Sequence, residues 1–496
     1  MAITNGPNLN VVPASGQQTL STNYLDLNGA GGWAQQYLPD LMEKEAEVFG
    51  PRTISGFLSK VGAEESMTSD QVVWSEQGRL HLSYTAQLTN GDAGTIAGGQ
   101  ITIGNDIDGH AAGINHGIRK NDTVIIASSE GTVKALVTLT DATAVIEVAP
   151  YGVVDLNDVF TDAQGANSLT ILVYGSEYGK GDNYDGAESR GANEPKMQTY
   201  SNKPIILKDY YEVSGSDVSK IGWVEVSGEE GQSGYLWYLK AEADTRARFT
   251  DYLEMSMLEG VKGGVVGGYT GGVADLTDSH LNLAATDTTG TQGLFNAIEE
   301  RGNITSGITG INAATDLAEF DAILAEFDKQ GAIEENMMFV NRATSLAMDD
   351  MLASMNSYGA GGTSYGVFDN SEDMALNLGF SGFRRGSYDF YKSDMRYLND
   401  KATRGGINTA AGSAAIRGVM VPAGTSTVYD QMLGKNLKRP FLHVRYRASQ
   451  TDDRRMKSWV TGSVGAATSA LDAMQIHMLS ERCLVTQGAN NFMLMK

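Results

Sequence analysis

The amino-acid sequence predicts a mixed α+β protein built from several domains. Short runs of β-branched and aliphatic residues recur between positions 91 and 180, separated by clusters of Gly, Asn and Asp. Evenly spaced short strands of this kind are typical of a small barrel or sandwich. A stripe of apolar residues at spacings of three and four then predicts one long helix at about 233–259. At 496 residues the chain has room for about two to four domains.

The segments before the β-rich region are expected to be extended. Residues 1 to about 30 are polar and rich in Gly, Asn and Ser, which indicates an arm rather than a packed element. Alternation in 72–74 and 80–84 predicts a β-hairpin or a long two-stranded loop. After the β-rich region, the apolar and aromatic residues in 205–213 again predict a strand.

The second half of the chain reads as helices and strands in alternation. The long helix is expected to begin at Ser233 and to end at Gly260, and the Gly-rich stretch 263–272 that follows is too flexible for a core. Two amphipathic helices are predicted around 317–327 and 346–355, with a buried strand at 337–340 between them. We expect strands and loops over 380–445, and a last helix near 464–482.

Composition and charge exclude several classes of protein. The net charge is −23, whereas a protein that grips nucleic acid normally has a basic surface. A single cysteine, Cys483, excludes an intrachain disulfide and indicates reducing surroundings. No basic stretch followed by an apolar run opens the chain, and no window approaches about eighteen apolar residues. We therefore expect neither a signal peptide nor a membrane span.

Motifs that would indicate an enzyme are weak. The stretch 362–366 (GTSYG) matches G-x-S-x-G with Ser364 as nucleophile, but the elbow needs a preceding strand and the preceding text is a glycine-rich loop. A glycine turn at 29–34 lacks the surrounding βαβ unit of a dinucleotide site. EF-hand loops anchored on Gly109 or Gly186 fail at their first and last ligand positions. We expect no catalytic residue, no metal and no cofactor.

A basic cluster at 435–457 is the one feature above background. Alternation in 441–447 places Arg445 and Arg447 on one face of a strand, and Leu442, Val444 and Tyr446 on the other. DNA contact, ion pairing with another subunit and a solvated strand face are all consistent with this pattern. Because the chain is so acidic, we favour ion pairing between identical subunits. The candidate interface residues are Lys435, Lys438, Arg439, Arg445, Arg447, Arg454 and Arg455.

The C-terminal third resembles the major capsid proteins of tailed bacteriophages. The stretches that carry the resemblance are 338–342 (MFVNR), 382–390 (GFRRGSYDF), 394–400 (DMRYLND), 419–426 (VMVPAGTS), 441–448 (FLHVRYRA) and 488–492 (GANNF). They look like those of large-genome podophages, including crAss-like ones. No short signature defines such proteins, so the likeness is one of overall character and of the order of elements.

The resemblance implies the Hong Kong 97-like capsid fold with an inserted small all-β domain. Its parts would map onto the chain as 1–60, N-terminal arm; 61–90, start of the extended loop; 91–180, inserted β-rich domain; 181–232, return of the extended loop and peripheral strands; 233–289, spine helix and Gly-rich connection; 290–435, axial domain; and 436–496, return strand of the peripheral domain and C-terminal helix.

The resemblance also implies a non-enzymatic structural role. Such proteins self-assemble as pentamers and hexamers into an icosahedral head around double-stranded phage DNA, which they contact weakly and without sequence preference. Portal and head-decoration proteins would be further partners, and no membrane would be involved. The expected location is the virion, after synthesis in the host cytoplasm. The alternatives are another virion structural protein, from the tail or the decoration of the head, or a serine hydrolase using Ser364.

Overall fold

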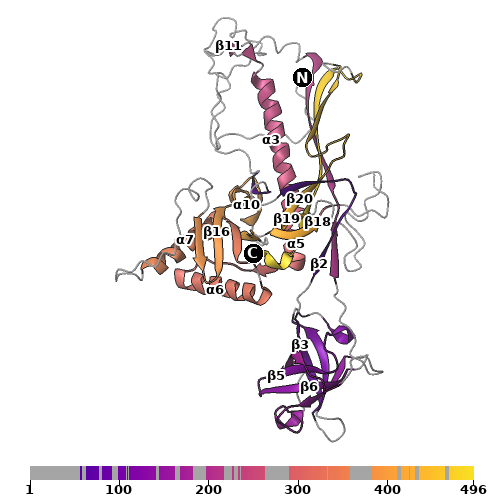
Figure 1. Ribbon diagram of the computed structural model, residues 1–496. Helices are drawn as coiled ribbons and strands as arrows, with labels where there is room; N and C mark the ends of the chain where they lie inside the picture. The colour runs from indigo at the N-terminus through magenta and orange to yellow at the C-terminus, as the bar shows by residue number, and fades with distance from the viewer. Residues whose placement is uncertain are drawn as a thin grey trace. The chain divides into compact units, whose positions relative to one another are not determined.

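The computed structural model describes a part of the chain that falls into two compact units. The described residues are 56–58, 63–77, 81–91, 99–107, 109, 111–140, 144–161, 168–181, 197–216, 226–227, 233–234, 236–262, 290–331, 333–357, 381–409, 415–423, 425–430, 435–463 and 468–496. One unit covers Trp74–Tyr200 and the other combines Met1–Val73 with Ser201–Lys496 (Figure 1). Most of the predicted arm and the Gly-rich stretch 263–272 lie outside the described residues.

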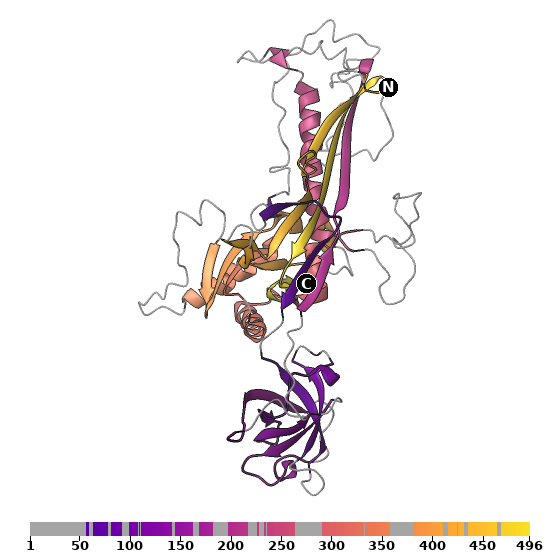
Figure 2. The ribbon, with the colours of Figure 1, turned by 45° about the vertical axis from the view of Figure 1, so that its right-hand side comes forward.

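The inserted unit is a closed six-stranded β-barrel, with strand order β3-β4-β7-β6-β5-β8 (Figure 2). Its strands are β3 Ser83–Asn90, β4 Gln100–Asp106, β5 Asp122–Ala127, β6 Thr132–Thr140, β7 Val145–Pro150 and β8 Leu169–Ser176. Single 3-10 turns lie at Gly113–Asn115 and Leu156–Asp158. Inward residues such as Ile101, Val124 and Ile146 are fully buried and form a core of its own.

Of the two alternatives predicted for 70–90, the hairpin is wrong, because β2 and β3 do not pair with each other. Strand β2, Val72–Gln77, pairs with β9, Met197–Asn202, which follows the barrel in the sequence. Strand β3 instead opens the barrel, eight residues before the expected boundary at 91, because Tyr84, Ala86 and Leu88 alternate with polar residues and point into the barrel core. Alternation identified the strands, but it could not identify their partners.

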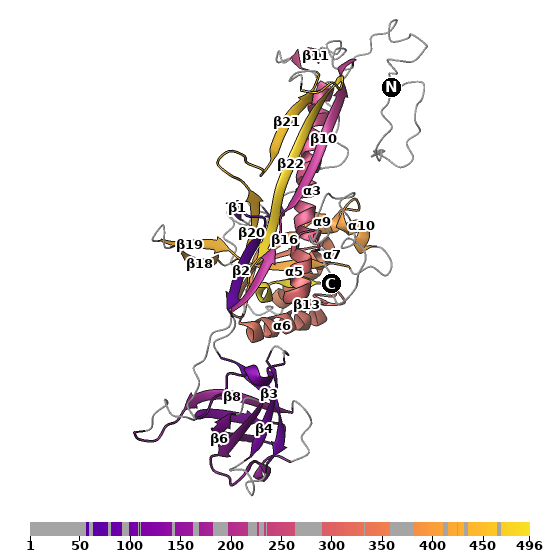
Figure 3. The same cartoon turned by 90° about the vertical axis from the view of Figure 1, so that its right-hand side faces the viewer.

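In the larger unit, five strands form a long sheet with the order β1-β20-β22-β10 and with β21 also paired to β22. They are β1 Ala63–Met67, β20 Leu442–Arg447, β22 Ala473–Thr486, β10 Ile205–Ser214 and β21 Lys457–Gly462. Figure 3 shows β21, β22 and β10 running side by side along one helix. A two-stranded hairpin, β18 Thr425–Asp430 and β19 Lys435–Pro440, lies between β17 and β20 in sequence.

The helix predicted near 464–482 is also wrong, because Ala473–Thr486 is the 14-residue central strand β22. From Met478 to Thr486 every residue of this strand is buried, including the polar residues Ser480, Glu481, Arg482 and Thr486, so neither face is exposed. Apolar residues then recur on both faces, and Leu471, Met474 and Met478 reproduce helical spacing by coincidence. A strand buried on both sides loses the alternation that identifies strands.

The long helix α3, Leu236–Glu259, packs against this sheet. Its residues Phe249 and Leu253 form a buried cluster with Met478 and the partly buried Leu207. Ser233 precedes the helix in a short strand, β12 Ser233–Gly234, which pairs with β11 Val226–Ser227. The expected end is confirmed: the Gly260 N–H donates to the Ser256 carbonyl at 3.0 Å.

A six-stranded mixed sheet forms the other part of this unit, with order β13-β23-β17-β14-β16-β15. Its strands are β13 Asn303–Thr305, β23 Met493–Met495, β17 Gly418–Pro422, β14 Glu335–Val340, β16 Tyr388–Asp394 and β15 Ser381–Arg385. The helices are α5 Leu294–Arg301, α6 Ala313–Gln330, α7 Arg342–Ser357, α9 Arg396–Asn399 and α10 Arg404–Asn408, with a 3-10 turn at Ala489–Asn491.

The predicted strand at 337–340 and the two helices around it are confirmed. The short helices α9 and α10 were not expected in 380–445. Buried Phe320, Phe327, Met338 and Phe390 belong to one core cluster between α6 and the sheet. The chain is therefore a mixed α+β protein, as the sequence predicts.

Glu254 of α3 anchors the start of the described chain. Its carboxylate accepts backbone N–H groups from Gly56 at 2.7 Å, Phe57 at 2.6 Å and Leu58 at 3.3 Å. Phe57 itself is buried and packs edge-to-face against Phe339, with ring centroids 4.5 Å apart. Burial raises the pKa of Glu254 above its usual value, the three N–H bonds oppose that change, and Asp251 adds to it.

We expect the contribution of Glu254 to folding stability to grow in mild acid. A carboxyl with a raised pKa in the folded state binds protons more strongly than in the unfolded chain, so its contribution to stability grows as pH falls through the folded pKa. Urea unfolding of the wild type and of Glu254→Gln at about pH 7 and about pH 5 measures this. The wild type should gain stability relative to the variant at the lower pH; an equal response of both would contradict the prediction.

Candidate functional site

The predicted basic residues lie on two strands and one turn of the larger unit. Arg445 and Arg447 are on β20, and Arg454 and Arg455 follow in the turn before β21. Leu442 and Val444 are buried in the main core, so the expected division of this strand into a charged and an apolar face is confirmed. Lys435, Lys438 and Arg439 lie on β19, where the structure describes the backbone alone.

Glu481 gathers two arginines on one face of the sheet. Arg447 Nε lies 3.3 Å from Glu481 Oε1, and Arg454 Nε lies 2.8 Å from Glu481 Oε2. Arg447 also contacts Asp70, and Arg445 Nη2 lies 2.7 Å from Glu65 Oε2. We call Glu65, Asp70, Arg445, Arg447, Arg454 and Glu481 the Glu481 cluster. Because Glu481 is 7% exposed, water screens its two ion pairs poorly.

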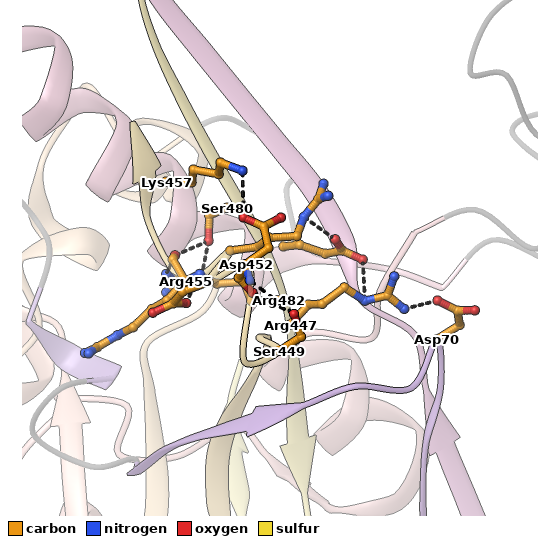
Figure 4. Close-up of polar contacts among 11 residues, drawn as sticks. Asp70, Arg447, Ser449, Asp452, Arg455, Lys457, Ser480 and Arg482 are labelled. Atoms are coloured by element: carbon orange, nitrogen blue, oxygen red, sulfur yellow. Dashed lines mark hydrogen bonds and ion pairs between the residues drawn. The ribbon is translucent and has the colours of Figure 1, made fainter. Parts of the chain in front are cut away.

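Arg482, the next residue of β22, points to the opposite face. Its Nε donates to Ser480 Oγ at 2.9 Å and its Nη2 donates to the Arg455 carbonyl at 2.8 Å (Figure 4). Glu64 contacts the Arg455 side chain and lies 3.8 Å from Arg482 Nη1. We call Glu64, Arg455, Ser480 and Arg482 the Arg482 cluster.

Burial lowers the pKa of the Arg482 guanidinium from its usual value, and the Arg455 charge adds to this while Glu64 opposes it. The Arg455 guanidinium also lies 5.7 Å from the centre of the Tyr446 ring, within range of a cation–π contact. Glu64 thus holds a buried arginine and a more exposed one together, at the margin of the sheet.

Together the two clusters fasten β1 and the turn 448–456 to the central strands. Register pairs Glu65 with Arg445 across the parallel β1–β20 contact, so the ion pair sits directly on the strand pairing. Lys457 adds a further pair to Asp452 in the turn, at 2.6 Å. The chemistry is structural, because charge-assisted hydrogen bonds between fixed strands add stiffness and register rather than reactivity.

The sequence therefore predicted cations whose partners lie in the same chain. Arg445, Arg447, Arg454 and Arg455 all contact carboxylates of the larger unit, and whether they also meet another subunit stays a prediction. Sequence reasoning missed the acidic half of the site, Glu64, Glu65, Asp70 and Glu481, together with Arg482. Asp70 and Arg447 are 377 positions apart, a separation over which a single sequence gives no indication of contact.

Other predicted features stay outside this site. Ser364 and its G-x-S-x-G motif lie outside the described residues. Within the part of the chain that is described, no group of three or more His, Cys, Asp or Glu side chains could hold a metal ion. No helix there is both long and apolar enough to cross a membrane.

Reversing the charge of Arg445 is expected to loosen β1. In Arg445→Glu the new carboxylate faces Glu65 where a 2.7 Å ion pair stood, so attraction becomes repulsion at a partly buried site. We expect a loss of folding stability on the order of 2 kcal/mol. Hydrogen exchange of 63–67 measures the effect. Arg445→Lys is the matched control, and equal exchange rates in the two variants would contradict the prediction.

Comparison with known proteins finds distant structural likenesses. No family model and no curated protein matches the sequence. Among solved structures, the capsid of cyanophage P-SCSP1u is 7% identical, with a TM-score of 0.39 over 97% of this chain and 98% of that chain. A chain of Microbacterium phage Oxtober96 is 9% identical, with a TM-score of 0.36 over 93% and 97%. The mature capsid of bacteriophage PhiM1 is 7% identical, with a TM-score of 0.34 over 92% and 91%. These scores are too low to support a conclusion about this chain.

Proposed function

We propose that this chain is a major capsid protein of a tailed bacteriophage, with the Hong Kong 97-like fold, from a crAss-like or related large podophage. The observation that carries the proposal is the combination of elements in the larger unit. A 24-residue helix packs along a long sheet, and a separate six-stranded sheet with its own helices is continuous with it in sequence. A spine helix in a peripheral domain, followed by an axial domain, is the order that the resemblance in the C-terminal third implies.

In this assignment α3 is the spine helix, and the long sheet is the peripheral domain. The six-stranded sheet of β13 to β17 and β23 is the axial domain, and the barrel is an insertion in the extended loop. Strands β19 and β22 belong to the last segment of the chain, 436–496, which returns to the peripheral domain.

Many copies would form pentamers and hexamers and close into an icosahedral head around double-stranded DNA. An excess of acidic residues, with a net charge of −23, suits a container that holds DNA without gripping it. The hairpin of β18 and β19 carries Lys435, Lys438 and Arg439 and pairs with none of the other described strands. We assign this basic hairpin to contact with the acidic surface of a neighbouring subunit. Portal and decoration proteins would join the same head, and the role is structural rather than enzymatic.

Negative-stain microscopy of the purified chain tests the proposal, first alone and then co-expressed with the neighbouring phage genes. Closed shells, or free rings of five and six subunits, are the expected result. A stable monomer under both conditions would overturn it. Labelling of Ser364 by a serine-directed probe, abolished in Ser364→Ala, would favour the hydrolase alternative instead.

A further inference from the structure

The outer surface of the barrel differs from one side to the other. On β3 and β4 the side chains between the buried positions are polar: Thr85, Gln87, Thr89, Gln100 and Thr102. On the neighbouring strands β6, β5 and β8 the outward positions include the apolar residues Ile125, Leu136, Leu172 and Tyr174. Leu172 is 39% exposed and Tyr174 is 50% exposed. Apolar side chains gathered on one side of a small domain are a feature of binding surfaces.

Two tyrosines lie next to each other on this side of the barrel. Tyr151 follows β7, and its N–H donates to the Lys134 carbonyl on β6 at 2.8 Å. The Lys134 ammonium lies over the Tyr174 ring, 5.9 Å from its centre. The Tyr151 hydroxyl donates to Glu177 Oε2, and this bond is the main reason why the pKa of Tyr151 is raised to about 12. Each ring is therefore held by a charged neighbour, although Tyr151 is 44% exposed. We call Lys134, Tyr151, Leu172, Tyr174 and Glu177 the tyrosine patch.

A β-bulge sets the position of Tyr174. Val173 is paired with Val124 and Gly175 with Thr123, so Tyr174 is the extra residue of β8 at this point. A bulge bends its strand and changes the direction of a side chain, and bulges are over-represented next to functional sites. The irregularity of β8 thus falls on the residue that carries the exposed ring.

The charges around the tyrosine patch favour a neutral ligand. Lys134 offers hydrogen-bond donors and Glu177 offers acceptors, so a ligand with a net charge of either sign meets one like charge. The unit Trp74–Tyr200 as a whole is acidic, with sixteen Asp and Glu against seven Lys and Arg. Nucleic acid is therefore disfavoured, because its phosphates need a basic surface.

The size of the patch favours a small ligand over a protein. Two half-exposed tyrosines offer roughly 200 Å² of surface. A stable contact between proteins buries about 800 Å² on each partner, far more than these rings and Leu172 supply. A short oligosaccharide fits better, because the C–H groups of a sugar ring stack on the negative face of an aromatic ring. The sugar hydroxyls both donate and accept hydrogen bonds, which matches a lysine and a glutamate side by side.

We propose that the tyrosine patch binds a neutral oligosaccharide. Its sugar rings stack on Tyr151 and Tyr174, Leu172 extends the apolar contact, and Lys134 and Glu177 hold the hydroxyl groups. Because both tyrosines are already held by their neighbours, little side-chain freedom is lost on binding. This inference goes beyond the proposed function and does not depend on it, since it concerns the barrel alone.

Saturation-transfer NMR of the full chain tests the inference, with cellotriose and chitotriose as neutral probes and sialyllactose as an acidic one. We expect transfer to at least one neutral probe, with a Kd of about 1 mM, and weaker transfer to sialyllactose. Tyr174→Ala and Tyr151→Ala should each weaken binding about tenfold, because each removes a stacking surface. Tyr174→Phe should bind as the wild type does, since it keeps the ring.

Tyr210→Ala is the matched control, because Tyr210 is 56% exposed but belongs to the larger unit. It should leave binding unchanged. Calorimetry checks that the unfolding transition of the barrel is the same in all the variants. If Tyr174→Ala lowers that transition, the comparison of Tyr151→Ala with Tyr210→Ala decides.

The possible outcomes are distinct from those of the shell experiment. No transfer to either neutral probe would overturn the inference, as would equal binding by the wild type and both alanine variants of the patch. Stronger transfer to sialyllactose than to the neutral probes would overturn the proposed class of ligand. Shells that form from a chain without sugar binding leave the proposed function standing, whereas sugar binding by a chain that forms no shell or ring supports this inference alone.

Discussion

Replacing Glu481 by glutamine is expected to destabilise the larger unit by about 3 kcal/mol. The substitution keeps the size of the side chain but removes the one negative charge that Arg447 and Arg454 share, at 3.3 and 2.8 Å. Two guanidinium groups would then repel each other beside a buried amide. Breaking one side of a buried ion pair costs more than the pair contributes, because the remaining charge stays desolvated. Urea unfolding followed by a probe in the larger unit measures the loss.

Asp452→Asn is the matched control for this variant. It also removes one carboxylate from an ion pair, with Lys457 at 2.6 Å, but both side chains are substantially exposed. Water screens such a pair, so the expected change is below about 1 kcal/mol. If both variants lost the same free energy of unfolding, the burial of Glu481 would not explain how much its ion pairs stabilise the protein.

Phe390→Ala is expected to lower the stability of the six-stranded sheet by about 3–5 kcal/mol. Phe390 is fully buried, and its ring lies 5.1 Å from Phe320 and 5.4 Å from Phe383. Removal of the ring leaves a cavity between α6 and the sheet, and the neighbouring rings are too rigid to fill it. Differential scanning calorimetry should show the transition of the larger unit moved to lower temperature.

Two controls accompany this prediction: the unfolding of the barrel and the variant Tyr391→Ala. The barrel has a separate core that shares no residue with the Phe390 cluster, so its own transition should not move. Tyr391→Ala removes the next side chain of the same strand, which points to the other face and is 40% exposed. We expect it to cost less than about 1 kcal/mol. A Phe390→Ala protein as stable as the Tyr391→Ala protein would contradict the role given to this core.

Most of the elements that the sequence predicted well have one buried face. Helices α6 and α7 show their period clearly, and β20 alternates because Leu442 and Val444 enter the core while Arg445 and Arg447 do not. Strand β14 is buried on both faces at Met338–Val340, and its short unbroken apolar run predicted it instead. Strand β22 failed because burial on both faces removed the alternation. The acidic half of the ion-pair site depends on a parallel contact between β1 and β20, which local pattern cannot reveal.

The barrel is attached through a pair of neighbouring strands. The chain passes into it by β2 and returns by β9, and these two strands are hydrogen-bonded to each other. The two chain segments that enter and leave the barrel are therefore about 5 Å apart where these strands pair. This spacing does not depend on the residues between the two strands. The entropic cost of closing a loop rises only slowly with its length. The number of residues between β2 and β9 therefore has little effect on the stability of the larger unit. Residues 78–196 thus have the character of a cassette, a stretch that evolution or an engineer can exchange for a tight turn or a foreign module.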